Sequence, residues 1–334
     1  MKKYLIILVF FTTYIEAIRC QSCLPDGIEL SSQYQIDQFK TTYPQCSEIG
    51  GDVLIKSSDG KNIINLNGLN NLTSIKGGLY IVFNDNLSSL SGLNNLKTIG
   101  GGLTIGYNHD VTDLSGLDSL VYVGGWVGIH YNISLTAVSG LNHLTAIGGG
   151  LNIHYNEVLK SIDALHNITS IGEGLDIEGN MALTSLTGLE NIDTGSISNL
   201  VIKLNYSLST CEVQSLCNYL RNPKGTIEIH DNSNGCSSQY EVKAACGLVS
   251  IANLTVNEGF TINPNPSSAH VIINATISLL NSDLNIFSYS GQQMIRSQIT
   301  VPQMVIDISD FPKGVYFVQV NNAKAVSSFK FIKE

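Results

Sequence analysis

The feature that most constrains this chain is a repeat of 24 residues. The stretch SGLNNLKTIGGGLTIGYN begins at Ser91, and SGLNHLTAIGGGLNIHYN begins 48 residues later, at Ser139. A fixed period of about 20–30 residues is typical of a solenoid, in which one coil cannot bury its apolar face alone. We therefore expect a stack of similar coils.

Apolar residues keep the phase of the repeat. Columns of Leu, Ile and Val recur at spacings of two and three residues rather than with a helical period. This pattern predicts short strands joined by tight turns. Glycine pairs precede the expected strands, and we expect them to supply the positive φ of a sharp corner. The pairs are Gly77-Gly78, Gly101-Gly102 and Gly149-Gly150.

One asparagine of each coil returns at the same period. The column consists of Asn84, Asn108, Asn132, Asn156 and Asn180. We expect a buried ladder, in which each amide satisfies backbone groups that a corner leaves unpaired. Asn132-Ile133-Ser134 fits the pattern for N-glycosylation, but the phase predicts an inward-facing Asn132.

The repeat resembles a known variety of leucine-rich repeat. The sequence GLNNLKTIGGGLTIGYNHDVTDLSGL and its neighbours are similar to the receptor L-domain, seen in the ligand-binding lobes of insulin- and EGF-type receptors. The resemblance covers roughly residues 50–245. It implies an all-β fold, a right-handed parallel β-solenoid with 24-residue coils, which we place at residues 50–247.

The cysteines fit caps at the two ends of such a solenoid. Cys23 and Cys46 precede the first coil and are expected to close an N-terminal cap at residues 21–49. Two degenerate coils at the other end hold four more cysteines at equivalent positions. Stacking of equivalent positions favours the pairs Cys211–Cys236 and Cys217–Cys246, although the other two pairings stay open.

The N-terminus has the features of a secretory signal peptide. MKKYLIILVFFTTYIEAIRCQ has two lysines and then an apolar run too short to span a bilayer. We expect a signal peptide over residues 1–20, with cleavage after Ala17 or Cys20, and export makes disulfides plausible. No other stretch is apolar for long enough to predict a transmembrane helix.

The period stops after Cys246, and we expect a linker over residues 248–258. Alternating strands and Gly or Pro turns then predict a small antiparallel β-sandwich over residues 259–334. Proline cannot donate to a ladder, so the Asn-Pro repeat is expected at a strand entry. The alternative to a targeting role is an ordinary terminal β-domain that binds something itself.

This last segment resembles the type A C-terminal sorting domain of the type IX secretion system of Bacteroidota. Its motifs occur in the expected order, and the chain ends in a basic strand. They comprise Asn263, Pro264, Asn265 and Pro266, the Gly291 hairpin, and Lys313-Gly314-Val315-Tyr316. The resemblance implies export by the type IX secretion machinery to the cell surface or the medium.

The sequence offers little for catalysis. It contains no nucleophile elbow, HExxH motif, P-loop or dinucleotide fingerprint, so we expect neither an enzyme nor a cofactor. A formal charge of −9 argues against nucleic acid or an anionic membrane surface as partner.

One group of polar and aromatic residues is phased so that neighbouring coils bring it together. It consists of His130, Tyr131, Asn152, His154, Tyr155, Asp176 and Glu178. Three interpretations are open: an aromatic ladder that stiffens the corner, a patch that contacts a protein or glycan, and a metal site at His130, His154 and Glu178. We do not commit to a metal. Trp126 replaces a glycine at one coil entry, as a plug or as a rim contact.

These patterns predict a secreted or cell-surface binding protein without enzymatic activity, whose solenoid presents a face to an extracellular protein or glycan. The alternative is a structural or adhesive component of the cell envelope that has no discrete ligand.

Overall fold

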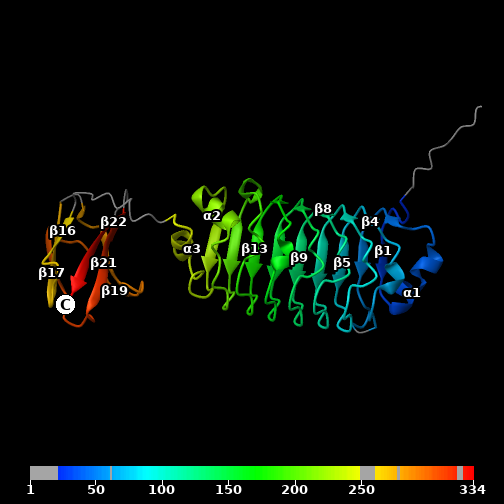
Figure 1. Ribbon diagram of the computed structural model, residues 1–334, viewed down its shortest axis with the longest axis horizontal. Coiled ribbons are helices and arrows are strands. Elements are labelled where there is room, and N and C mark those ends of the chain that lie inside the picture. Colours follow the sequence, from blue (N-terminus) through cyan, green and yellow to red (C-terminus); the bar gives the residue numbers. More distant parts are fainter. Residues whose placement is uncertain (1–21, 61, 249–259, 277–278, 322–325) are drawn as a thin grey trace, which may run out of the picture. The chain divides into compact units, whose positions relative to one another are not determined.

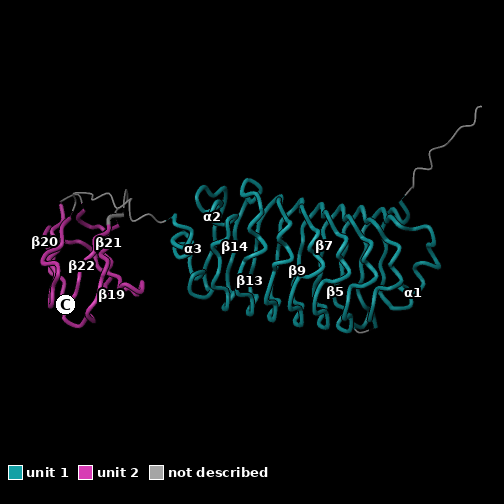
Figure 2. Tube along the Cα trace, in the orientation of Figure 1, with its two compact units in different colours: residues 1–249 teal, residues 250–334 magenta. Residues whose placement is uncertain are grey.

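The computed structural model describes residues 22–60, 62–248, 260–276, 279–321 and 326–334. The expected signal peptide and nearly all of the expected linker lie outside these residues. The chain divides into two compact units at residues 249 and 250 (Figure 2). Each unit has its own apolar core among the described residues.

The first unit is a parallel β-solenoid (Figure 1). Within residues 22–248, nine strands form one parallel sheet and six form a second. The larger sheet comprises, in spatial order, β1 (Ile28–Leu30), β3 (Val53–Ile55), β5 (Leu79–Val82), β7 (Leu103–Gly106), β9 (Val127–His130), β11 (Leu151–His154), β13 (Leu175–Glu178), β14 (Leu200–Lys203) and β15 (Ile227–His230). The smaller comprises β12 (Ser170–Ile171), β10 (Ala146–Ile147), β8 (Tyr122–Val123), β6 (Thr98–Ile99), β4 (Ser74–Ile75) and β2 (Glu48–Ile49).

The repeat sets the register of the larger sheet. Leu79 pairs with Leu103 and Ile81 with Ile105, each 24 residues further along the chain. These four side chains are fully buried, as are the leucines of the turns, so equivalent residues of successive coils fill one continuous core. The predicted solenoid is confirmed. Short 3-10 turns, η1 (Asn67–Leu69), η2 (Asp163–Leu165) and η3 (Thr194–Ser196), interrupt its irregular side.

The asparagine column forms a hydrogen-bonded ladder inside the solenoid. Asn132 is fully buried, and its Nδ2 donates to the carbonyl of Ile105 at 3.0 Å. Its Oδ1 accepts from the backbone N–H of Asn108 at 3.2 Å. The ladder continues through Asn205 and Asn232, which the sequence analysis missed because their spacings are longer, at 25 and 27 residues.

The expectation for the glycine pairs is wrong. None of the six has a positive φ; the corner glycines that do are Gly92, Gly116, Gly140 and Gly188, with φ between 101° and 113°. The pairs are needed for space instead. A Cβ on Gly101 would lie 2.6 Å from the backbone nitrogen of Gly78, so the coils could not approach as closely with any larger residue there.

Disulfides and helices close both ends of the solenoid. Cys23 bonds Cys46 beside α1 (Gln33–Thr42), whose Ile36 and Phe39 are buried. At the other end are α2 (Gln214–Arg221) and α3 (Gln239–Ala245), with the bonds Cys211–Cys236 and Cys217–Cys246. Of the possible pairings of those four cysteines, these are the two that stacking favours.

The second unit consists of antiparallel sheets. In its described residues, three strands form one sheet, β16 (Phe260–Asn263), β17 (His270–Ala275) and β20 (Gln303–Asp307). Four form the other, β19 (Gln293–Gln298), β18 (Asp283–Ser288), β21 (Gly314–Asn321) and β22 (Val326–Lys333). As expected, Gly291 lies in the hairpin between β18 and β19 with φ +84°, and Gly314 opens β21.

The Asn-Pro motif does not lie at the entry of a strand. Asn263 is the last residue of β16, so the motif follows the exit of that strand. Asn265 connects the motif to β22 at the end of the chain. Its Nδ2 donates to the carbonyl of Lys330 at 3.0 Å, and its Oδ1 accepts from the N–H of Ile332 at 2.9 Å. Pro264 and Pro266 have no backbone N–H to donate, so they fit this segment, which lies outside the strands.

Candidate functional site

The candidate site lies on the outer surface of the larger sheet. Successive residues of a strand point to opposite faces, so the buried Leu, Ile and Val positions leave the alternate residues outside. In β9, β11 and β13 those outer residues are Gly128 and His130, Asn152 and His154, and Asp176 and Glu178. We call the surface of these three strands the outer face.

The structure brings the seven predicted site residues together. His154 pairs in register with His130 on one side and with Glu178 on the other, and Asn152 pairs with Asp176. Tyr131 and Tyr155 follow their strands directly, with φ of 56° and 53°. All seven side chains are partly exposed. Their role in binding stays a prediction.

The two tyrosines belong to a longer aromatic ladder. Successive ring centroids of Phe83, Tyr107, Tyr131 and Tyr155 lie 4.6, 4.8 and 5.0 Å apart, and the rings are nearly parallel. All four residues have a left-handed backbone, which bulky side chains rarely adopt. Each ring stacks on one or two neighbouring rings, as the stacking interpretation expects.

Hydrogen bonds and ion pairs occupy the polar groups at the C-terminal side of the outer face. The Tyr155 hydroxyl donates to Glu178 Oε1, and this bond is the main cause that raises the pKa of Tyr155 to about 12. Lys203 Nζ lies 3.9 Å from Glu178 Oε2 and 3.2 Å from Glu228 Oε2. The hydrogen bond to Glu228 raises the pKa of Lys203. One lysine thus lies between two glutamates.

His154 and Asp176 are close but poorly aligned. Nε2 of His154 lies 3.2 Å from Oδ1 of Asp176. The distance suits an ion pair, but the angles do not make a hydrogen bond, and within the described residues both atoms are buried without a hydrogen-bond partner. Each of these two atoms therefore still lacks a hydrogen-bond partner in that part of the chain.

The metal interpretation gains no geometric support. Among the described residues, no three His, Cys, Asp or Glu side chains are arranged so that they could hold a metal ion. His130, His154 and Glu178 are neighbours in register only.

His130 is the outer-face residue with the clearest pH response. Burial, and secondly the nearby His154, lower the pKa of His130 from its ordinary 6.5. The unfolded chain therefore takes up this proton first as the pH falls. The stability that neutral His130 contributes is complete above about pH 6.5 and is lost as the pH falls from there to the lowered folded-state pKa.

We accordingly expect the stability of His130→Gln to decline less between pH 7 and pH 5 than that of the wild type. Urea unfolding at each pH measures the difference. His143→Gln, which changes an exposed histidine, controls for the number of histidines. Parallel pH profiles for His130→Gln and the wild type would contradict the assignment.

Two residues important for the outer face lay outside the predicted set. Trp126 is 43% exposed, and its indole covers Gly149 and Gly150; a Cβ on Gly150 would lie 2.2 Å from Trp126 Cζ3. It is thus both a cover over the next coil and an exposed aromatic surface. Gly128 is the other, since it leaves a position of the face without a side chain. The tryptophan at a position where other coils have glycine can be recognised in the sequence. Nothing in the sequence distinguishes Gly128 as an exposed position without a side chain.

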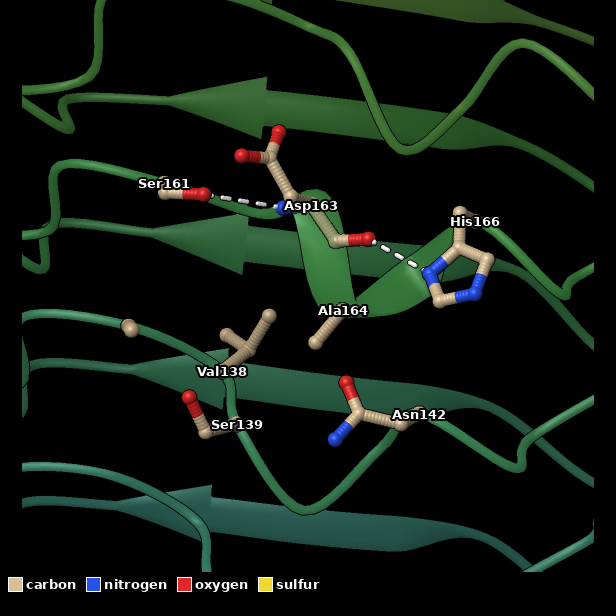
Figure 3. A pocket seen from close by; sticks show the side chains of 8 residues that line it. Val138, Ser139, Asn142, Ser161, Asp163, Ala164 and His166 are labelled. Atoms are coloured by element: carbon tan, nitrogen blue, oxygen red, sulfur yellow. Dashed lines mark hydrogen bonds between the residues drawn. The ribbon is translucent and has the colours of Figure 1, made fainter.

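A pocket of about 320 Å³ lies away from the outer face, between two turns of the irregular side (Figure 3). Its polar side chains hold the turns in shape. Ser161 Oγ accepts from the N–H of Asp163 at 3.0 Å, and His166 Nδ1 lies 2.9 Å from the Asp163 carbonyl. No nucleophile and base meet there among the described residues, so the outer face is the better candidate.

Two segments of the chain match known families. Residues 45–120 match the receptor L domain, and residues 261–334 match the secretion system C-terminal sorting domain. No curated protein matches the chain. Both resemblances seen in the sequence are thereby confirmed, and the sorting domain marks the protein for export to the cell surface or the medium. In the described part of the chain, no helix has the length and apolar character needed to cross a membrane.

Proposed function

We propose that this chain, which joins a receptor L domain to a secretion system C-terminal sorting domain, is an exported binding protein without catalytic activity. The observation that carries the proposal is the outer face. There, three adjacent strands hold partly exposed polar and aromatic side chains in fixed register. The ligand is an extracellular protein or glycan.

The rigidity of the outer face supports a role in binding. Its side chains stand on a sheet whose inner residues are fully buried, so little freedom is left to lose when a ligand is bound. The Asn152 side chain makes no hydrogen bond to any described residue. This amide can be satisfied by a ligand.

The same contacts argue against acid–base chemistry by the two carboxylates of the face. A carboxylate that acts as a general base must be free to accept a proton from a substrate. Glu178 instead accepts from Tyr155 and lies beside Lys203, and Asp176 lies beside His154. These contacts suit a fixed surface for recognition rather than proton transfer.

The sorting domain supports the type IX secretion machinery as the partner during export. Removal of this domain at the surface, followed by attachment or release, completes the proposed route. The solenoid is then the part that meets the ligand.

An array of glycans and surface proteins, probed with the exported protein, tests the proposal. We expect the paired variant His154→Ala, Tyr155→Ala to bind the captured ligand about tenfold or more weakly, because it removes two adjacent side chains from the centre of the face. Tyr34→Ala, which truncates an exposed tyrosine on α1, is the control. Thermal melting verifies that all variants are folded. Unchanged affinity of the paired variant would mean that the face is structural and that the ligand binds elsewhere.

A further inference from the structure

Gly128 leaves a gap in the middle of the outer face. His130 is the next outward residue of β9, and Trp126 directly precedes this strand. Thr104 and Asn152 lie opposite Gly128 on β7 and β11. Outward neighbours on one strand are about 6.6 Å apart, and neighbouring strands about 4.8 Å apart. We call Gly128 and these four surrounding residues the Gly128 site.

Nothing fills the position above Gly128. A Cβ built on this glycine would meet His130 Nδ1 at 3.5 Å and Thr104 Oγ1 at 3.9 Å, which are ordinary contacts. By contrast, the neighbouring Gly106 is covered by the His130 ring, at 2.5 Å from a Cβ built there. The surface above Gly128 therefore lies lower than its surroundings, and the side chains of His130 and Thr104 border this shallow depression.

Trp126 adds a second exposed aromatic surface, which is separate from the ladder. The ladder rings stack at 4.6–5.0 Å and cover one another. The Trp126 indole instead lies over Gly149 and Gly150, where no side chain competes for space, and is 43% exposed. An indole face that carries partial negative charge attracts the weakly positive C–H groups of a sugar ring.

The polar groups around Gly128 are unused by the protein. The side chains of Thr104, His130 and Asn152 and the Trp126 indole N–H make no hydrogen bond to any described residue. The set includes both donors and acceptors, which suits hydroxyl groups, because each hydroxyl can donate and accept.

The charges near the depression disfavour an anionic ligand. Asp176 lies beside His154, and Glu178 beside Lys203. Burial keeps His130 neutral at pH 7 by lowering its pKa. A protein partner would be anchored by a wider apolar centre than one indole.

We propose that the Gly128 site binds one sugar ring of a neutral glycan, which stacks on Trp126 and hydrogen-bonds Asn152 and its neighbours. The inference rests on the proposed function, since it assigns the ligand class of the same face.

Trp126 provides a direct probe, because it is the one tryptophan of the sequence. The exported protein is titrated with neutral oligosaccharides of β-glucan, xylan and mannan, and binding is followed by Trp126 emission and by calorimetry. The same protein is applied to the array of glycans and surface proteins. We expect at least one of the three oligosaccharides to bind and to shift the emission.

Two variants test the site from opposite directions. Trp126→Ala removes the stacking surface, and Gly128→Val fills the depression; we expect each to weaken glycan binding about tenfold or more. Gly128 has no left-handed φ, and valine suits a strand, so Gly128→Val is expected to fold and to keep its tryptophan. Tyr34→Ala is the control, because Tyr34 is an exposed aromatic residue on α1, outside the outer face. This variant should bind the glycan normally.

Each other result overturns the inference. Glycan binding that survives both substitutions places the ligand elsewhere. Capture of a protein, without binding of any of the three oligosaccharides, rejects the glycan but leaves the proposed function intact. Failure to capture any glycan or protein rejects both proposals.

Discussion

A chain that lacks residues 259–334 is expected to accumulate in the periplasm and to be missing from the cell surface and the medium. Residues 261–334 match the sorting domain, so the deletion removes the export address. The solenoid should still fold, because its core contains no residue of the second unit. Fractionation of a native host, followed by immunoblotting, measures the distribution.

Two controls separate lost sorting from lost folding. The truncated solenoid, purified from the periplasm, should melt as cooperatively as the same unit of the full chain. Residues 259–334 attached to an unrelated periplasmic reporter should carry that reporter out of the cell. Normal amounts of the truncated chain in the medium would refute the targeting role and revive a terminal β-domain that binds something itself.

Asn132→Ala is expected to lower the free energy of unfolding of the solenoid by about 1–3 kcal/mol. The substitution removes the side-chain partner of two buried backbone groups, the N–H of Asn108 and the carbonyl of Ile105. Neither can reach water, because Asn132 and its neighbours in the ladder are fully buried. Chemical denaturation followed by circular dichroism measures the change.

Asn70→Ala is the matched control, since Asn70 lies in an exposed turn after η1. We expect it to unfold at nearly the same denaturant concentration as the wild type. If the two variants were equally stable, the asparagine column would contribute nothing specific.

The 24-residue period predicted the solenoid, because many columns of equivalent residues recur with the same spacing. The leucine and asparagine columns each demand burial in every coil, and no other fold satisfies both. The prediction weakened where the spacing changed. Asn205 and Asn232 continue the ladder at 25 and 27 residues, so a fixed period missed them.

The role of a single glycine was harder to predict, because glycine is required at different positions for different physical reasons. Gly101 gives space between coils, Gly116 takes a positive φ of 113°, and Gly128 leaves a surface position empty. In one sequence these three look alike. The predicted binding residues do lie together, but which side chains are already satisfied depends on contacts such as Tyr155 with Glu178, and spacing does not reveal them.

The constant register has a consequence for how such a protein changes over generations. Each central strand pairs with equivalents 24 residues away on both sides, and the asparagine of each coil bonds to the next. An in-frame duplication of one coil therefore inherits every backbone and ladder partner at once. Recombination between near-identical coils can thus lengthen or shorten the recognition surface by whole strands without redesigning either cap.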